Sequence, residues 1–231
     1  MAKFTPGPMV AAVSGKQGGT IFSRNRYGAY TRYHAIPVQP GTVYQLNQRG
    51  LIGTFSQAFQ NLTDDQRQAW RTWAQANPVV DSLGQQQILT GHAAYVKINT
   101  RIYRMDGSFI NVPPVAAPPQ SIQLTSGTAY ASTQAVSVAF DATPLLAGQH
   151  AIVDAAVVFS PAKLYVKNLY KQVLVTDAAE ASPISCGDEI VERFGVLQTG
   201  QIIHIRVRVG DEASGLYSAP TAIVIEVEAA P

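Results

Sequence analysis

Apolar residues in the first half of the chain recur at the spacing of an amphipathic helix. Four of them lie three, four and three positions apart, which places them on one helix face: Ile52, Phe55, Phe59 and Leu62. Thr63 follows directly, and Gln66 stands three residues further on, so the pair is typical of a capping box. This pattern predicts one helix that ends near residue 62 and a second that begins after Thr63.

Two more apolar stripes extend the helical region. The second helix has its apolar side at four positions and is expected to end at Asn77-Pro78: Ala69, Trp70, Trp73 and Ala74. A third helix is predicted between a Thr90 cap and Gly107. Its buried positions are expected to be Tyr95, Ile98, Ile102 and Met105. Three short helices with two tryptophans are enough to form a compact core.

The residues before these helices have no helical period, because glycine and proline interrupt them throughout. Two β-type stretches, "GTIFSRN" and "GAYTRYHAI", flank Arg26-Tyr27-Gly28 and predict a loose hairpin. We therefore interpret residues 1–41 as an extended, glycine-rich hairpin arm.

The second half of the chain consists of β-branched runs separated by turn residues. The predicted strands are "AVSVAF", "AIVDAAVVFS", "KLYVKN", "QVLVT", "IIHIRVRV" and "TAIVIEVE". Turn residues recur roughly every 8–12 positions, as expected for an antiparallel sandwich. We interpret the acidic group Asp188, Glu189 and Glu192, which lies between two of these runs, as a solvated loop.

The end of the chain resembles a fibronectin type III domain, a member of the immunoglobulin-like sandwiches. Such domains carry a leucine, a glycine turn, an alternating strand and a Ser-x-Pro loop before the last strand. The corresponding residues are Leu197, Gly200, Ile205, Val207, Ser218 and Pro220. The resemblance implies an all-β fold but no particular function.

Charge divides the chain at the same point as the strand and helix patterns. Residues 1–107 hold 11 Lys and Arg against 4 Asp and Glu, a net +7, whereas residues 108–231 hold 6 against 11, a net −5. The stretch "INVPPVAAPPQS" between them favours an extended polyproline spacer. We predict an α+β, multidomain chain with an arm (1–41), a three-helix domain (42–110), a linker (111–121) and a sandwich (122–231).

Candidate chemistry is sparse. Lys16 precedes its glycines, in the reverse order of a phosphate-binding loop. His34, His92, His150 and His204 lie far apart, and Cys186 has no basic neighbour to activate it. We therefore expect no catalytic site, no cofactor and no metal. A charged content of 14% is low for a free enzyme and suits a chain that works inside a larger assembly. No apolar run approaches the ~20 residues that span a bilayer.

The arm carries the residues that we predict to bind a partner protein. Arginine and tyrosine are enriched at binding hot spots, and glycine lets two backbones approach closely. The predicted docking residues are Lys16, Phe22, Arg24, Arg26, Tyr27, Tyr30 and Arg32. The same residue types also contact nucleic acid, so a nucleic-acid arm and a self-contained domain remain as alternatives. A docking arm is favoured because about four cations are few for a nucleic-acid surface.

A second resemblance covers the first 107 residues. "GKQGGTIFSRNRYGAYTR", "NLTDDQRQAW" and "LTGHAAYVKIN" are similar to uncharacterised proteins of tailed bacteriophages. The resemblance implies a virion structural protein, assembled in the host cytoplasm and located in the virion. The leading expectation is a capsid decoration (cement) protein. The alternatives are a tail, neck or baseplate component and a carbohydrate-binding adhesin. The expected partners are the major capsid protein or other shell subunits, and the chain is expected to form a homo-oligomer within the particle; neither nucleic acid nor membrane is expected.

Overall fold

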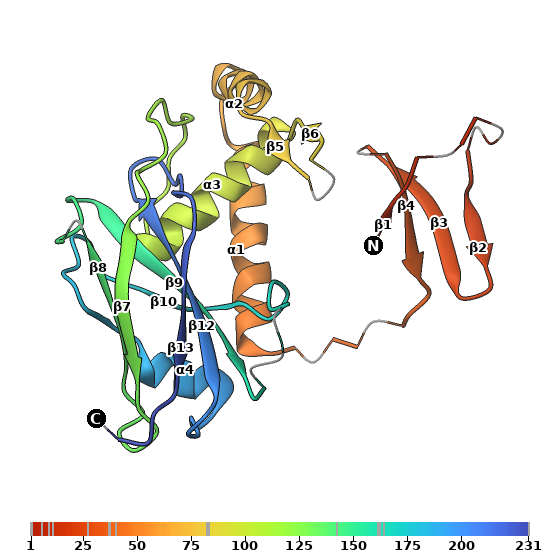
Figure 1. The fold of residues 1–231 in the computed structure, drawn as a ribbon. Coiled ribbons are helices and arrows are strands. Elements are labelled where there is room, and N and C mark those ends of the chain that lie inside the picture. The colour runs from red at the N-terminus through yellow and green to blue at the C-terminus, as the bar shows by residue number, and fades with distance from the viewer. Residues whose placement is uncertain are drawn as a thin grey trace. The chain divides into compact units, whose positions relative to one another are not determined.

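The computed structural model covers the whole chain and divides it into two compact units, Met1–Ala94 and Tyr95–Pro231. It describes residues 2–5, 7–8, 10, 12–26, 28–36, 38–39, 41–81, 84–141, 143–160, 163 and 165–230. Helices and antiparallel sheets occur together, so the coarse class predicted from the sequence, a mixed α+β chain, is confirmed (Figure 1).

The chain begins with a four-stranded antiparallel sheet, here called the N-terminal sheet, in the order β1-β4-β3-β2. Its strands are β1 (Ala2–Lys3), β2 (Gly15–Gln17), β3 (Thr20–Asn25) and β4 (Gly28–Tyr33). The predicted hairpin is present as β3 and β4. The sequence did not predict β1 or β2. Gly18, at the two-residue turn into β3, has a φ of +57°, a conformation that glycine adopts without strain.

Three helices follow, at the places that the apolar stripes predict: α1 (Val43–Gln60), α2 (Asp64–Ala76) and α3 (Gly91–Met105). The capping box is formed, since the Gln66 amide donates to Thr63 Oγ1 at 3.3 Å and the Thr63 amide donates to Gln66 Oε1 at 3.0 Å. Thr90 Oγ1 likewise caps α3 by accepting from the Ala93 amide at 3.0 Å. A short hairpin, β5 (Val79–Val80) with β6 (Gln86–Gln87), lies between α2 and α3 along the chain.

The helical part of the first unit has its own buried side chains. Phe55, Leu62, Trp70 and Ala74 are buried, which agrees with two of the predicted stripes. Trp70 and Trp73 meet edge to face, with ring centroids 5.9 Å apart. The stripe on α1 is only partly covered, however, because Ile52 remains 44% exposed.

The second unit contains a sandwich of two antiparallel sheets with the orders β10-β9-β12-β13 and β11-β8-β7 (Figure 1). The strands are β7 (Gln123–Ala129), β8 (Val136–Asp141), β9 (Gln149–Val158), β10 (Lys171–Val175), β11 (Ile184–Ser185), β12 (Ile202–Asp211) and β13 (Thr221–Glu226). Alternate residues of β12 point into the core, as its sequence pattern predicts: Ile203, Ile205, Val207 and Val209. Side chains of both sheets share this core.

Two local predictions in this unit are wrong. The run "KLYVKN" forms no strand: the described residues among 163–168 lie outside every sheet. Residues 188–192, predicted as a solvated loop, belong to helix α4 (Gly187–Phe194). This helix forms because Ile190 is fully buried in the sandwich core, with Val191 and Phe194 packed beside it, while its acidic residues occupy the first turn.

The division between the two compact units differs from the predicted layout. The sequence places all of the third helix in a 42–110 domain and the boundary in 111–121, whereas the units divide between Ala94 and Tyr95, inside α3. The reason is close packing: a methyl group on Gly215 would lie 2.9 Å from Ile102 Cγ1, and one on Gly210 would lie 2.7 Å from Met105 Sδ. The later part of α3 therefore packs with the sandwich.

Candidate docking surface

The pairing register of the N-terminal sheet separates the predicted docking residues into two groups. Directly paired residues in antiparallel strands share a face, and alternate residues along a strand change face. Ile21 pairs with Lys16 on one side and with Arg32 on the other, and Ser23 pairs with Tyr30. Lys16, Tyr30 and Arg32 therefore lie on one face, here called the basic face.

Phe22 and Arg24 alternate with Ile21 and Ser23, so they lie on the opposite face of the sheet. Phe22 meets Phe4 edge to face at 6.0 Å between ring centroids, with an interplanar angle of 85°. This aromatic pair half-buries Phe22, whereas Arg24 is exposed. The opposite face is thus mainly apolar near β1 and carries a single arginine among the residues predicted to dock.

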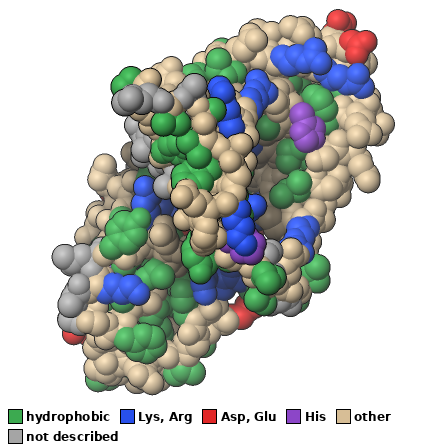
Figure 2. Space-filling view, turned by 90° about the vertical axis from the view of Figure 1, so that its right-hand side faces the viewer, with side chains coloured by type: hydrophobic (Ala, Val, Ile, Leu, Met, Phe, Trp, Pro, Cys, Tyr) green, Lys and Arg blue, Asp and Glu red, His purple; other side chains and the backbone are tan. Residues whose placement is uncertain are grey.

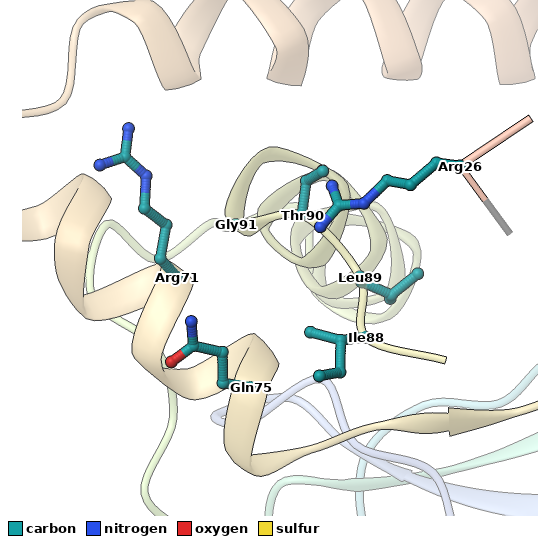
Figure 3. Close-up of a pocket in the computed structure, with 7 residues that line it drawn as sticks. All are labelled: Arg26, Arg71, Gln75, Ile88, Leu89, Thr90 and Gly91. Carbon is teal, nitrogen blue, oxygen red and sulfur yellow. The ribbon is translucent and has the colours of Figure 1, made fainter. Parts of the chain in front are cut away.

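Arg26 lies in the loop between β3 and β4 and belongs to neither face. It lines a hollow of about 260 Å³, in which it extends toward Thr90 at the start of α3 (Figure 3). The other lining residues are Arg71, Gln75, Ile88, Leu89 and Gly91. Tyr27, the remaining predicted docking residue, lies outside the described residues.

The basic residues of the sheet differ in their ion pairing. Lys3, paired with Tyr30 and so on the basic face, forms an ion pair with Asp81, which also accepts from Gln87. Among the described residues no carboxylate lies within ion-pair distance of the four predicted docking cations, all of them exposed: Lys16, Arg24, Arg26 and Arg32. Figure 2 shows lysine and arginine more widely spread than acidic residues on the face that it draws.

An exposed apolar segment follows the sheet, and its residues are not among the docking residues predicted from the sequence. Tyr33 is 77% exposed, Ile36 87% and Val38 89%. Tyr33 is the last residue of β4, and the other two residues lie outside every helix and strand. Large apolar side chains at this exposure are typical of surfaces that a partner covers. Tyr33 and Ile36 belong to the stretch "GAYTRYHAI", which the sequence predicts as β-type, whereas β4 ends at Tyr33.

The other chemical candidates have structural explanations. His150 is buried, with Nδ1 2.8 Å from the Thr176 carbonyl oxygen and Nε2 3.0 Å from Glu212 Oε2, so it ties three segments of the sandwich together. Burial, and then the charge of Glu189, raise the pKa of the Cys186 thiol to about 12, which makes it unreactive. Over the described ranges, no three His, Cys, Asp or Glu residues are placed to hold a metal. That the chain is not an enzyme stays a prediction.

No family model and no curated protein matches the chain. A fibronectin III-like protein from Clostridium thermocellum is 12% identical, with a TM-score of 0.31, over 48% of this chain and 95% of that one. The adhesin domain of Epf from Streptococcus pyogenes is 13% identical, with a TM-score of 0.31, over 47% of this chain and 33% of that one.

A family 76 glycoside hydrolase from a bovine Bacteroides thetaiotaomicron strain is 9% identical, with a TM-score of 0.34, over 48% of this chain. The match spans only 21% of the hydrolase. Likenesses at this level carry no information about what the chain binds or does. Separately, none of the helices in the described residues has the length and apolar character needed to cross a membrane.

Proposed function

We propose that this chain is a structural protein of a tailed-bacteriophage particle, a capsid decoration protein that docks through residues 1–41 and exposes a fibronectin III-like sandwich. The observation that carries the proposal is the exposure of the N-terminal sheet and of the apolar segment after it. Lys16 and Arg32 on the basic face have no acidic partner in the described chain, and Ile36 and Val38 are almost fully exposed.

A partner surface would supply what these residues lack. Burying a fully exposed isoleucine or valine stabilises a complex by roughly 1.5–3 kcal/mol, and acidic groups on the partner would pair with the basic face. The strands at the two edges of the N-terminal sheet, β1 and β2, are two and three residues long, so they offer few backbone groups for strand addition. Docking is therefore expected through side chains more than through an added strand.

The same surface weakens the competing proposal of nucleic-acid binding. Lys16 and Arg32 share one face with Tyr30, while Arg24 lies on the other face and Arg26 in a loop, so the cations form no continuous track along a phosphate backbone. A gel-shift measurement with duplex DNA at physiological salt tests whether the chain binds nucleic acid. Retardation that disappears when residues 1–41 are removed would replace the docking proposal by the nucleic-acid one.

Removal of residues 1–41 tests the proposed function. The helices and the sandwich have their own buried cores, so circular dichroism should show the shortened chain folded. Its copy number in purified particles should fall to background when it replaces the full chain. A second variant, Ile36→Ser with Val38→Ser, retains the N-terminal sheet and should also load poorly. Full loading of both variants would rule out docking through this region.

A further inference from the structure

Two arginines of β12 converge on one buried carboxylate in the second unit. Arg206 pairs with Asp154 of β9, and both project from the side of the sheet away from the sandwich core. Asp154 Oδ2 accepts from Arg206 Nε at 3.1 Å, from Arg206 Nη2 at 2.8 Å and from Arg208 Nη2 at 2.8 Å. The Asp154 side chain is only 4% exposed. One oxygen of this carboxylate, Oδ2, therefore accepts from both guanidinium groups.

A third arginine reaches the same region from α3. The Arg101 guanidinium carbon lies 4.2 Å from the centroid of the Tyr217 ring, and that of Arg208 lies 5.2 Å from the same centroid. Both cations thus share one aromatic ring. Within the part of the chain that the structure describes, the Arg101 side chain makes one hydrogen bond, to the Gly215 carbonyl oxygen at 3.5 Å, the outer limit of such a bond.

The charges of this cluster do not balance. Arg206 and Arg208 share the single carboxylate of Asp154, and Arg101, which meets Arg208 over the Tyr217 ring, has no carboxylate within ion-pair distance among the described residues. Burial lowers the pKa of Arg101; the nearby Tyr217 acts in the opposite direction, and the Arg208 charge lowers it further. A buried charge without a counter-charge is unfavourable, so the cluster as described favours a bound anion.

One donor of the cluster also lacks an acceptor. Arg208 Nε is buried and has no hydrogen-bond partner among the described residues. Arg101 and Arg208 are nevertheless only half-buried as residues, and the Arg208 side chain is 25% exposed. A partly buried donor set that small ions can reach is the arrangement in which an anion gains the most from guanidinium groups.

We propose that Arg101 and Arg208, beside Tyr217, form a binding site for a tetrahedral oxyanion of the phosphate class. Several oxygens on one centre can accept from guanidinium forks that approach from different directions, whereas a carboxylate presents its two oxygens in one plane. The ligand is either free phosphate or the phosphate group of an ester, which share this chemistry. This site lies in the second unit and is independent of the proposed docking function.

The test is titration of the full-length chain with inorganic phosphate by isothermal calorimetry, at constant ionic strength so that general screening does not change. Arg101→Gln is the informative variant, because Arg101 makes no bond to Asp154 and its removal leaves both Asp154 ion pairs in place. Arg49→Gln, an exposed arginine on α1, is the matched control. Saturable binding by the wild type and the control, weakened at least tenfold in Arg101→Gln, is the expected result.

Two further arms complete the test. Arg101→Lys keeps the charge but removes the planar fork and should recover only part of the affinity. Glycerol 3-phosphate in place of phosphate separates the sources: tighter binding than inorganic phosphate identifies an ester as the ligand, and weaker binding identifies the free ion. Absence of saturable binding by the wild type, equal binding by Arg101→Gln, or equal binding of acetate would each overturn the proposal.

Discussion

Lys16 and Arg32 lie on the same face of the N-terminal sheet, two strands apart, with Ile21 paired to both of them. Arg24, although close to both in sequence, lies on the opposite face. A partner that docks on the basic face would therefore contact Lys16 and Arg32 together but not Arg24.

The double variant Lys16→Glu/Arg32→Glu should accordingly bind particles about tenfold more weakly, equivalent to about 1.4 kcal/mol, because it turns two attractive charges into repulsive ones. Arg24→Glu makes the same kind of change on the other face and should bind nearly as the wild type does. Sedimentation of each variant with particles that lack the chain, at several salt concentrations, measures the affinity of each variant for the particle. If Arg24→Glu is as defective as the double variant, docking does not select the basic face.

Gly187 begins α4 in a position that has no room for a side chain. A methyl group there would lie 2.3 Å from the Gln134 carbonyl oxygen and 2.9 Å from the Val136 amide nitrogen, both backbone atoms that cannot move aside independently. Gly187→Ala should lower the free energy of unfolding by about 1–3 kcal/mol.

Gly53, inside α1, is the matched control for that substitution, because nothing lies within 4 Å of a methyl group at this position. Gly53→Ala should stabilise the chain by about 0.5–1 kcal/mol, since alanine loses less backbone freedom in a helix. Urea unfolding followed by circular dichroism compares the two. A neutral Gly187→Ala would contradict the close packing of α4 against β8.

Cys186 links the stability of the sandwich to alkaline pH. Its pKa is raised from 9.0 to about 12 in the folded chain, chiefly by burial. Between these values the unfolded thiol loses its proton while the folded one keeps it, so the unfolded state binds fewer protons and stability falls as pH rises. The contribution of this thiol is complete below about pH 9 and diminishes by about 1.4 kcal/mol per pH unit above it.

Unfolding free energies at pH 8, 9.5 and 10.5 for the wild type and Cys186→Ala test this linkage. The free energy of unfolding should fall less steeply with rising pH in the variant than in the wild type. The titration of tyrosines is common to both proteins and does not contribute to this difference. Native Cys186 should also resist iodoacetamide at pH 8 and react after unfolding. Rapid alkylation of the folded chain would show that the thiol is not buried.

Local signals in the sequence predicted the helices well. Thr63 and Gln66 are three residues apart and form their capping box without help from distant residues. The alternation of apolar and polar residues also predicted β12, since every second residue of this strand enters one core. The strand β1 could not be predicted from the sequence, because it is two residues long and forms by pairing with β4. Helix α4 was missed because its apolar residues span barely two turns and are stabilised by the sandwich core.

For the candidate site, too, local features could be predicted from the sequence and contacts between distant residues could not. Composition identified the cations and aromatics of the arm, but only the register of β3 and β4 separates Phe22 and Arg24 from Tyr30 and Arg32. The cluster around Asp154 and Tyr217 could not be read from the sequence at all. It requires α3, β9 and β12 to come together in three dimensions.

The composition of the particle decides between a structural role in the capsid and the alternatives. Quantitative mass spectrometry of purified tailed-phage particles from cells that carry the gene measures the copy number of the chain relative to the major capsid protein. A capsid decoration protein should be present at a fixed, high ratio in intact particles, and at the same ratio in DNA-filled heads separated from their tails. Absence of the chain from purified particles would contradict a structural role, and its presence only in the tail fraction would contradict capsid decoration.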